Sequence, residues 1–243
     1  MVVDRGLWIT WYDVPAAGRE AYMSWLHGSW MPRLLREPGV LWGAHYECEK
    51  KPSPSGGVHR LRETDDQSIP RGNEFILLLG AETAHAFAKL LPGRSGQPSS
   101  EDAKMLALRG GERVNVVTEE ARADGPSAGK REGKWALSSY IQLGSFNAGS
   151  AAEHDLLDWY ATCRLPSMAK LPGCLGIRKY ASVSGWAKHV VLYEFESEQA
   201  RKDHFLNHEF DNPEWAKWTD ALVRKLVHAP GSPCVARRIW PKA

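Results

Sequence analysis

The pattern of apolar and polar positions in the first half of the chain predicts alternating strands and helices. Residues 7–13 place aromatic or β-branched side chains on both faces of an extended chain, as in a strand covered on both sides. From Glu20 to Leu34 the apolar residues recur at helical spacing, and Pro38 with Gly39 ends that helix. The same criteria predict strands at 40–48, 74–79 and 113–118, and helices at 81–91 and 100–108.

The second half of the chain repeats this order. Strands are predicted at 135–143, 174–184, 189–196 and 235–240, and helices at 151–171, 198–208 and 213–227. Each half therefore reads βαββαβ. This is the order of a ferredoxin-like unit, in which a four-stranded antiparallel sheet carries its helices on one face.

A stretch that starts at Trp25 is repeated from Trp159 and indicates how the two halves are related. Six identical pairs share one offset without a gap, 159 − 25 = 134. We interpret the repeat as an internal duplication. The pairs are Trp25 and Trp159, Pro32 and Pro166, Pro38 and Pro172, Gly39 and Gly173, Leu41 and Leu175, and Tyr46 and Tyr180.

Residues 119–134 contain no large apolar side chain and are predicted to be a linker. The expected domains are a first ferredoxin-like unit at 1–118, the linker at 119–134, and a second unit at 135–243. Each sheet has one face without helices, and packing these two faces together buries both. The predicted fold class is α+β, with two tandem units packed sheet to sheet as an intramolecular dimeric α/β barrel.

Composition narrows the class of partner. The chain has 31 Lys and Arg against 29 Asp and Glu, and this net charge of +2 gives no reason to expect a nucleic acid or a membrane as partner. Eleven tryptophans suit a roomy apolar pocket as well as a core or an interface. The four cysteines form no C-x-x-C pair and indicate reduced thiols. The start of the chain alternates like a strand and carries an acid, so a cytoplasmic protein is expected.

A helix, turn and strand motif in each half carries a family resemblance. In the second half the matching residues are Trp159, Tyr160, Pro166, Pro172, Gly173 and Tyr180, and in the first half they are Trp25, Pro32, Pro38 and Gly39. The motif resembles W-Y-D-x-E-H-I-P followed by P-G-F/V and a strand that ends in Tyr, the pattern of EthD-like and related dimeric α/β-barrel proteins. The resemblance covers most of both halves and implies the barrel fold.

The resemblance departs at the family's Glu-His pair, which is replaced by Ser29-Trp30 and by Cys163-Arg164. The role of that pair therefore does not carry over, and a shared fold by itself implies no activity. The superfamily implies a range of activities: cofactor-free oxygenases, lactone isomerases, polyketide cyclases, small-molecule lyases, and haem enzymes such as chlorite dismutases and aldoxime dehydratases.

The candidate catalytic residues His27, His45 and Glu47 lie in the first half. A histidine near a carboxylate is a usable general base, because its ordinary pKa of about 6.5 needs little change. A histidine at a helix end is more often a capping or solvent-facing residue, and that alternative stays open. The aromatic residues expected to line a substrate pocket with them are Trp8, Tyr12, Trp30, Trp42 and Tyr46.

The second half offers Arg164, Arg178 and His189 as further substrate-binding residues, because an arginine can hold a carboxylate or an enolate. The alternative for these residues is an ion-pair network between the two sheets. His204 and His208 stand at i, i+4, and with Glu209 they have donors for a cation, but such residues at the polar end of a helix are more often solvated. No metal site is expected.

The leading hypothesis is a cofactor-independent enzyme that acts by proton transfer on a small, largely apolar molecule, aromatic or polyketide-like. Such an enzyme would be a lyase, isomerase or cyclase with a histidine base. The alternatives are a haem enzyme with one histidine as axial ligand, and a barrel that binds a small molecule without turnover. A homodimer is compatible with each of them.

Overall fold

A computed structural model describes residues 3–49, 61–90, 98–131, 135, 138–206, 208 and 212–242. Eight antiparallel strands form a closed barrel, and a ninth short strand, β8 (Leu226–His228), pairs with the end of β5. The first half contributes β1 (Gly6–Asp13), β2 (Val40–Cys48), β3 (Phe75–Ala81) and β4 (Gly110–Asp124). The second half contributes β5 (Tyr140–Ala148), β6 (Cys174–Ser184), β7 (His189–Phe195) and β9 (Cys234–Trp240).

The strands follow one closed order around the barrel. The first half runs β4-β1-β3-β2 and the second half runs β9-β5-β7-β6. The two sheets are also joined at their edges, because β4 pairs with β6 and β2 pairs with β9. The predicted α+β barrel is therefore confirmed, and hydrogen bonds at both seams make it one continuous sheet rather than two sheets that only face each other.

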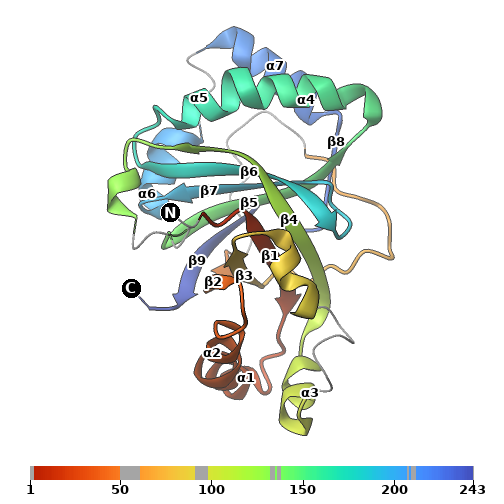
Figure 1. Cartoon of the computed structure of the whole chain (residues 1–243). Helices are drawn as coiled ribbons and strands as arrows, with labels where there is room; N and C mark the ends of the chain where they lie inside the picture. The colour runs from red at the N-terminus through yellow and green to blue at the C-terminus, as the bar shows by residue number, and fades with distance from the viewer. Residues whose placement is uncertain are drawn as a thin grey trace.

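The helices cover the barrel on two opposite sides (Figure 1). Helices α1, α2 and α3 lie on the side of the first half, and α4, α5 and α7 lie on the side of the second half. Beyond the segments described below, the helices are η2 (Ala84–Leu90), α3 (Ser100–Leu106), η3 (Ala128–Lys130), η4 (Ser150–Ala152), α6 (Glu198–Ala200), η6 (Arg201–Phe205) and α7 (Pro213–Val223).

The first long helix of each half contains a π-helical turn at the same place. The boundaries of the two helices differ by the offset of the sequence repeat, 153 − 19 = 134 and 165 − 31 = 134. Pro32 and Pro166 account for the wide turn, because proline has no N–H and its ring pushes back the carbonyl four residues earlier. The segments are α1 (Arg19–Trp25), η1 (Leu26–Trp30), α2 (Met31–Leu34), α4 (Glu153–Trp159), η5 (Tyr160–Arg164) and α5 (Leu165–Met168).

The two repeated glycines turn the chain from helix to strand. Gly39 and Gly173 have φ angles of 90° and 73°, which residues with a Cβ rarely adopt. A Cβ at Gly39 would lie 2.9 Å from that of Ala86, and one at Gly173 would lie 2.5 Å from that of Ala200. The repeated Pro-Gly therefore serves the fold, through a backbone conformation and a close contact that both halves need.

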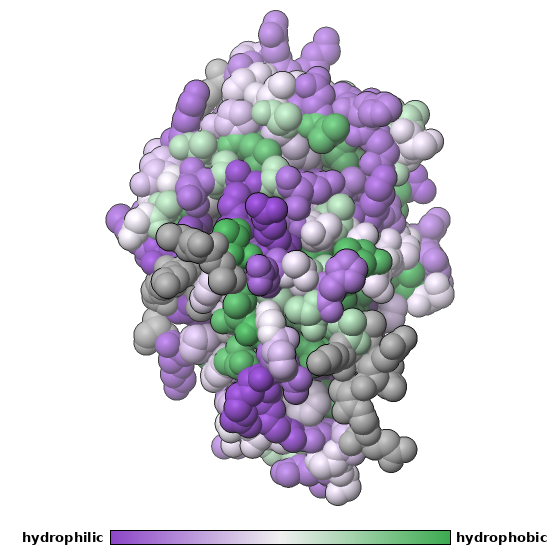
Figure 2. Space-filling model, in the orientation of Figure 1, coloured by the Kyte–Doolittle hydropathy of each residue, from purple (hydrophilic) through white to green (hydrophobic). Residues whose placement is uncertain are grey.

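Side chains alternate between the barrel interior and the two helical layers. On β1, Ile9 and Trp11 belong to the interior cluster, whereas Tyr12 belongs to the layer under the helices of the first half. A third apolar cluster fills the layer under the helices of the second half. On the visible face of the molecule, hydrophilic side chains cover most of the surface and apolar ones form small groups between them (Figure 2).

Three predicted elements are corrected by the structure. Residues 119–124 of the expected linker belong to β4 and pair with β6, and their ion pairs replace the large apolar side chains that a strand usually offers. The strand expected at 135–143 spans 140–148. The helix expected at 81–91 is a short 3₁₀ helix at 84–90.

Candidate active site

The structure brings the predicted histidines of the first half together. Nε2 of His27 lies 2.8 Å from Nδ1 of His45, and Nε2 of His45 lies 2.8 Å from the hydroxyl of Tyr12. His45 is fully buried and His27 is half-buried. His45 lies on strand β2 and His27 on the π turn η1, and the alternation of β2 points the His45 ring toward that helix.

This contact belongs to a longer buried chain of hydrogen bonds. Arg109 donates from Nε to the Tyr22 hydroxyl at 2.8 Å, and the side chain of Tyr22 bonds to that of Tyr12. A guanidinium can only donate, so the Tyr22 hydroxyl accepts from Arg109, and a neutral His45 that accepts at one ring nitrogen donates at the other. Burial raises the pKa of Tyr12 and lowers the pKa of His45 well below its ordinary value.

Three of the residues predicted for this site lie elsewhere. The Glu47 side chain is exposed to solvent and is not the carboxylate partner of a histidine in the described contacts. Trp42 and Tyr46 point into the barrel interior, where Trp42 donates to Asp4 at 2.7 Å and Tyr46 donates to the carbonyl of Ser138 at 2.8 Å. Neighbouring residues of a strand face opposite sides, so these two cannot share a cavity with His45.

The remaining aromatic residues predicted for the first half pack against one another. Trp8 donates to the hydroxyl of Thr10 at 2.8 Å and meets the ring of Phe87 edge-on at 6.0 Å. Trp30 stacks on Trp25 with ring centres 5.2 Å apart. These large rings fill the layer between the sheet and the helices on this side of the barrel.

The corresponding layer of the second half contains a cavity of about 140 Å³. Its floor is the outer face of β5, β7 and β8, and its roof is formed by η5, η6 and α7. Aromatic and aliphatic side chains make up most of the wall. The lining residues are Leu61, Gln142, Gly144, Phe146, Trp159, Tyr160, Arg164, Val191, Tyr193, Phe205, Leu206, His208, Thr219, Leu222, Val223, Leu226, His228 and Pro233.

The cavity exists because two positions on the sheet have smaller side chains than the equivalent positions of the first half. The offset of 134 places Gln142 where Trp8 stands and Gly144 where Thr10 stands (142 − 8 = 134; 144 − 10 = 134). A Cβ at Gly144 would lie 3.0 Å from a methyl carbon of Val191. The missing indole and the missing side chain therefore open this layer.

His228 is the polar group of the cavity that the sequence did not reveal. Its side chain is 5% exposed, and its Nδ1 is buried without a hydrogen-bond partner among the residues that the structure describes. Burial lowers the pKa of His228 to about 4, and a hydrogen bond to the backbone of Arg62 opposes this shift. The imidazole is therefore neutral at pH 7. It lies just past the predicted helix at 213–227, on a strand of three residues, β8, so its periodicity gave no signal.

Arg164, predicted as a substrate-binding residue, does line this cavity. Its Nη1 donates to Nε2 of His208 at 2.8 Å, and Nδ1 of His208 donates to the carbonyl of Phe205 at 2.6 Å. The guanidinium lies over the ring of Trp159 at 4.5 Å from its centre. A guanidinium held flat against aromatic side chains brings a positive charge to the wall of the pocket.

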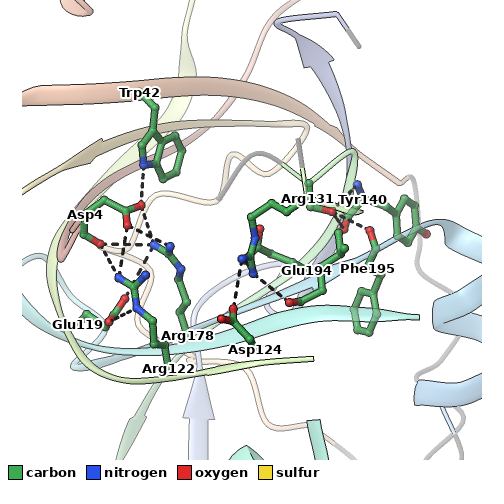
Figure 3. A network of polar contacts seen from close by, with 12 residues as sticks. Asp4, Trp42, Glu119, Arg122, Asp124, Arg131, Tyr140, Arg178, Glu194 and Phe195 are labelled. Carbon is green, nitrogen blue, oxygen red and sulfur yellow. Dashed lines mark hydrogen bonds and ion pairs between the residues drawn. The ribbon is translucent and has the colours of Figure 1, made fainter. Parts of the chain in front are cut away.

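Arg178 and His189 are not part of the cavity wall. Arg178 lies in the barrel interior and binds Asp4 with two hydrogen bonds of 2.8 and 3.1 Å, as the ion-pair alternative expected (Figure 3). Burial raises the pKa of the Asp4 carboxyl, but the contacts with Arg178 lower it by more, so the pKa lies below its ordinary value. His189 lies 2.8 Å from Nζ of Lys179 and 3.1 Å from Glu153.

Within the described ranges, no three His, Cys, Asp or Glu side chains are grouped so that they could hold a metal ion. The candidate Glu209 lies outside these ranges, and His204 is exposed. The helices that the structure describes are all too short or too polar to cross a membrane.

Comparisons with known proteins support the fold. Neither a family model nor a curated protein sequence matches this chain. An anthrone oxidase-like protein of solved structure is similar over 97% of this chain and 91% of its own, with a TM-score of 0.62 and 10% identity. A monooxygenase-like protein from Fusobacterium nucleatum matches over 98% and 94%, with a TM-score of 0.61 and 9% identity.

A chlorite dismutase from Candidatus Nitrospira defluvii has a TM-score of 0.52 at 10% identity, and covers 97% of this chain and 90% of its own. The likeness extends over nearly the whole length of each chain. It confirms the dimeric α/β-barrel fold that the family resemblance implied. At identities this low the likeness carries the fold alone.

Proposed function

We propose that this protein is an enzyme that acts on a small, largely apolar molecule by proton transfer, and that the cavity of the second half is its active site. The observation that carries the proposal is the Nδ1 of His228, which is buried in a wall of aromatic and aliphatic side chains and has no hydrogen-bond partner among the described residues. A buried acceptor without a partner costs roughly 1–3 kcal/mol. A ligand that donates to Nδ1 removes that cost when it binds.

The chemistry follows from two of the polar groups in the wall of the pocket, His228 and Arg164. His228 takes a proton from the substrate, and the guanidinium of Arg164 stabilises the negative charge that this leaves on oxygen. An imidazole with a pKa of about 4 is a weak base, so it removes the proton of an enol or a phenol only while the Arg164 guanidinium stabilises the anion. Return of the proton to another atom would complete an isomerisation, and loss of a leaving group from the anion would complete a lyase reaction.

The volume of the cavity limits the substrate to a single ring. A cavity of about 150 Å³ lined by apolar side chains holds one benzene molecule, whereas drug-sized ligands occupy roughly 300–1,000 Å³. At about 140 Å³ this cavity fits the smaller class. Of the aromatic and polyketide-like substrates expected from the sequence, the pocket therefore favours a monocyclic aromatic or enolic compound.

A haem does not fit the described pocket. His208 and His228 are the side chains that could reach a haem iron there, but the volume is well below that of pockets for drug-sized ligands, and a haem is larger still. We therefore propose catalysis without a cofactor. A barrel that binds the same small molecule without turnover remains the alternative, and turnover measurements separate the two.

Proton exchange tests the proposed function directly. Monocyclic enols and phenols are incubated with the protein in D₂O, and deuterium that enters at carbon is followed by NMR. The native protein is expected to accelerate exchange for at least one compound, and His228→Ala to lose most of this acceleration. His154→Ala, which changes an exposed histidine of α4, is the matched control. Full activity of His228→Ala would refute the assignment.

The pair His27 and His45 is a second candidate for the base. Their hydrogen bond and burial favour it, because the half-buried His27 can exchange protons with solvent and with the buried chain. His27→Ala enters the same exchange assay. If His27→Ala loses the acceleration of exchange and His228→Ala keeps it, the active site lies in the first half.

We also propose that the barrel consists of two tandem ferredoxin-like units, 1–118 and 135–243. The equivalent strand orders and the helices that repeat at one offset support this division. Assembly of the whole chain into a homodimer is a further proposal, which the molecular mass in solution tests.

A further inference from the structure

One side chain in the wall of the proposed active site is held by a buried arginine. Gln142 lies on β5 and lines the cavity, whereas Arg201 lies on the π turn η6, outside the cavity wall. Nε and Nη2 of Arg201 both donate to Oε1 of Gln142, at 2.8 and 2.6 Å. The guanidinium also lies 5.7 Å from the centre of the Phe205 ring. Gln142 and Arg201 are 7% and 6% exposed, so their contact is shielded from solvent.

The residue that corresponds to Arg201 in the first half is Phe87. The glycine of the repeated Pro-Gly turn packs against Ala86 in the first half and against Ala200 in the second, so these two alanines are equivalent. Phe87 and Arg201 are the next residues in the chain. Each belongs to the short helical segment that follows the third strand of its half, and each is buried.

The two halves therefore have different pairs of side chains at equivalent positions. In the first half, Trp8 meets the ring of Phe87 edge-on at 6.0 Å, which is an apolar contact. In the second half, Gln142 stands in place of Trp8, and its amide binds a guanidinium. Among the residues that the structure describes, no carboxylate forms an ion pair with Arg201. Because a buried cation beside a neutral acceptor costs free energy that an apolar pair avoids, packing alone does not explain this pair.

The contact with Arg201 fixes which end of the Gln142 amide remains for a ligand. A guanidinium only donates, so the atom that it binds is the amide oxygen. The other end of the same planar group is Nε2, which carries two N–H donors. Within the described part of the chain, Nε2 has no hydrogen-bond partner. Because Arg201 lies outside the wall and Gln142 forms part of it, these two N–H groups are the donors that the amide offers to the cavity.

We propose that Gln142 binds the oxygen of the substrate, and that Arg201 is a positioning residue that keeps the N–H groups of Gln142 turned toward it. The amide donates to a carbonyl oxygen, or to the oxygen that gains negative charge when the proton leaves. The guanidinium polarises the amide and strengthens these donors, because hydrogen bonds in a chain reinforce one another. The ligand class is a monocyclic compound with an accepting oxygen, such as a cyclic ketone or its enolate. This role rests on the proposed function only in taking the cavity as the active site.

NMR of the protein labelled at its glutamine side chains tests the orientation without a ligand. A hydrogen bond to the amide oxygen deshields the carbonyl carbon, so we expect the Gln142 signal to move upfield in Arg201→Met. Lys202→Met, which changes an exposed neighbour on the same turn, should leave that signal in place. A Gln142 signal that is the same in the native protein and in Arg201→Met would refute the positioning role.

Calorimetry with cyclohexanone and methylenecyclohexane tests the ligand class. The two probes have the same ring and shape, but the accepting oxygen of the first is a CH₂ group in the second. Gln142→Glu keeps an acceptor for Arg201 and removes the N–H donors, so a purely structural contact survives in this variant. We expect it to bind cyclohexanone at least about 10-fold more weakly than the native protein does, with little change for methylenecyclohexane. An unchanged ratio of the two affinities, or native protein that binds no cyclohexanone, would refute the inferred ligand class.

Gln142→Met removes the donors without adding a charge and should show the same loss for cyclohexanone. Arg201→Met should lose less, about 3-fold, because the amide keeps its donors but not their fixed direction. Deuterium exchange separates the role of Gln142 from the proposed function. If the binding results hold and no compound exchanges, the proposed function fails and the role of Gln142 stands. If His228→Ala abolishes exchange and Gln142→Met keeps the full rate, the role of Gln142 fails and the function stands.

Discussion

The two layers between the barrel and its helices have the same backbone arrangement, but side chains fill one of them and leave a cavity in the other. Under the helices of the first half, Trp8 and Thr10 help to fill the space, and a chain of neutral hydrogen-bonding groups runs through it. Under those of the second half, Gln142 and Gly144 leave a cavity. The comparison teaches that the repeated residues build the barrel, whereas two smaller side chains leave a cavity under the helices of the second half.

The buried polar groups of the two halves differ in the same way. Lys179 stands 134 residues after His45, and its ammonium group has three acceptors: Glu120 at 2.6 Å, His189 at 2.8 Å and the carbonyl of Tyr180 at 3.1 Å. Its three N–H donors are therefore satisfied. The second half keeps a closed ionic cluster beside its pocket, while the first half keeps a hydrogen-bonded chain that begins at the Arg109 guanidinium and ends at the half-buried His27.

The largest effect is expected from hollowing the first half. Trp8→Gln with Thr10→Gly copies the residues of the second half into a layer that is otherwise packed. Loss of the partly buried indole should lower the free energy of unfolding by about 3 kcal/mol, the lower end for a buried aromatic side chain, which denaturant titration measures. A stability within about 1 kcal/mol of the native value would mean that this layer tolerates a cavity as well as the second half does.

The reverse exchange should close the second half to ligands. Gln142→Trp with Gly144→Thr copies the first half into the pocket, where the new atoms would occupy the cavity beside Val191. Phenol affinity, measured by calorimetry, is expected to fall at least about 100-fold, or roughly 2.7 kcal/mol. Leu157→Gln, on the exposed face of α4, should leave the affinity unchanged. Native affinity in the double variant would place the ligand outside this cavity.

Acidification should destabilise the protein through its buried neutral histidines. The pKa of His228 is about 4 in the folded state and 6.5 as the ordinary value, so below pH 6.5 the unfolded chain binds the extra proton first. Stability is present in full above pH 6.5 and falls as the pH drops toward 4, by roughly 2 kcal/mol at pH 5 from this group alone. His228→Phe should flatten the pH dependence of unfolding, and an unaltered slope would contradict the burial of a neutral ring.

A smaller effect is expected from shortening the hydrogen-bonded chain. Tyr12→Phe puts in the first half the residue that the second half already has at Phe146, and it removes the hydroxyl that meets His45. The loss should be about 1.5 kcal/mol in the free energy of unfolding, near the upper end for one hydrogen bond. Phe146→Leu provides no such contact change and serves for comparison. No loss in Tyr12→Phe would show that His45 finds another donor.

The sequence predicted most of the elements and the repeat, because these follow from periodicity, and it named His27 and His45 as candidates without predicting their contact. It did not reveal the pocket, because the pocket arises from the smaller side chains of Gln142 and Gly144 and not from a recognisable motif. His228 was missed for a related reason. Its strand has only three residues, and its partner in space, the Arg62 carbonyl, is far away in the chain.

The predicted site also mixed two sides of one strand. Trp42 and Tyr46 were grouped with His45, although alternate residues of β2 face the barrel interior and the helical layer. Which face of β2 lines the barrel interior depends on how the barrel closes. Pairing between strands that are distant in sequence determines this closure. The end of β4 was missed for the same reason, because its residues are held by pairing with β6.

The pairing of β4 with β6 and of β2 with β9 means that each of the eight barrel strands described has neighbours on both sides. In a barrel made from two identical chains, symmetry would force both halves to carry the same residues, so that a change that opens one pocket opens the other. Joining the halves in one chain removes that constraint. One half can then stay densely packed and stabilise the barrel while the other accumulates the changes that make a binding site.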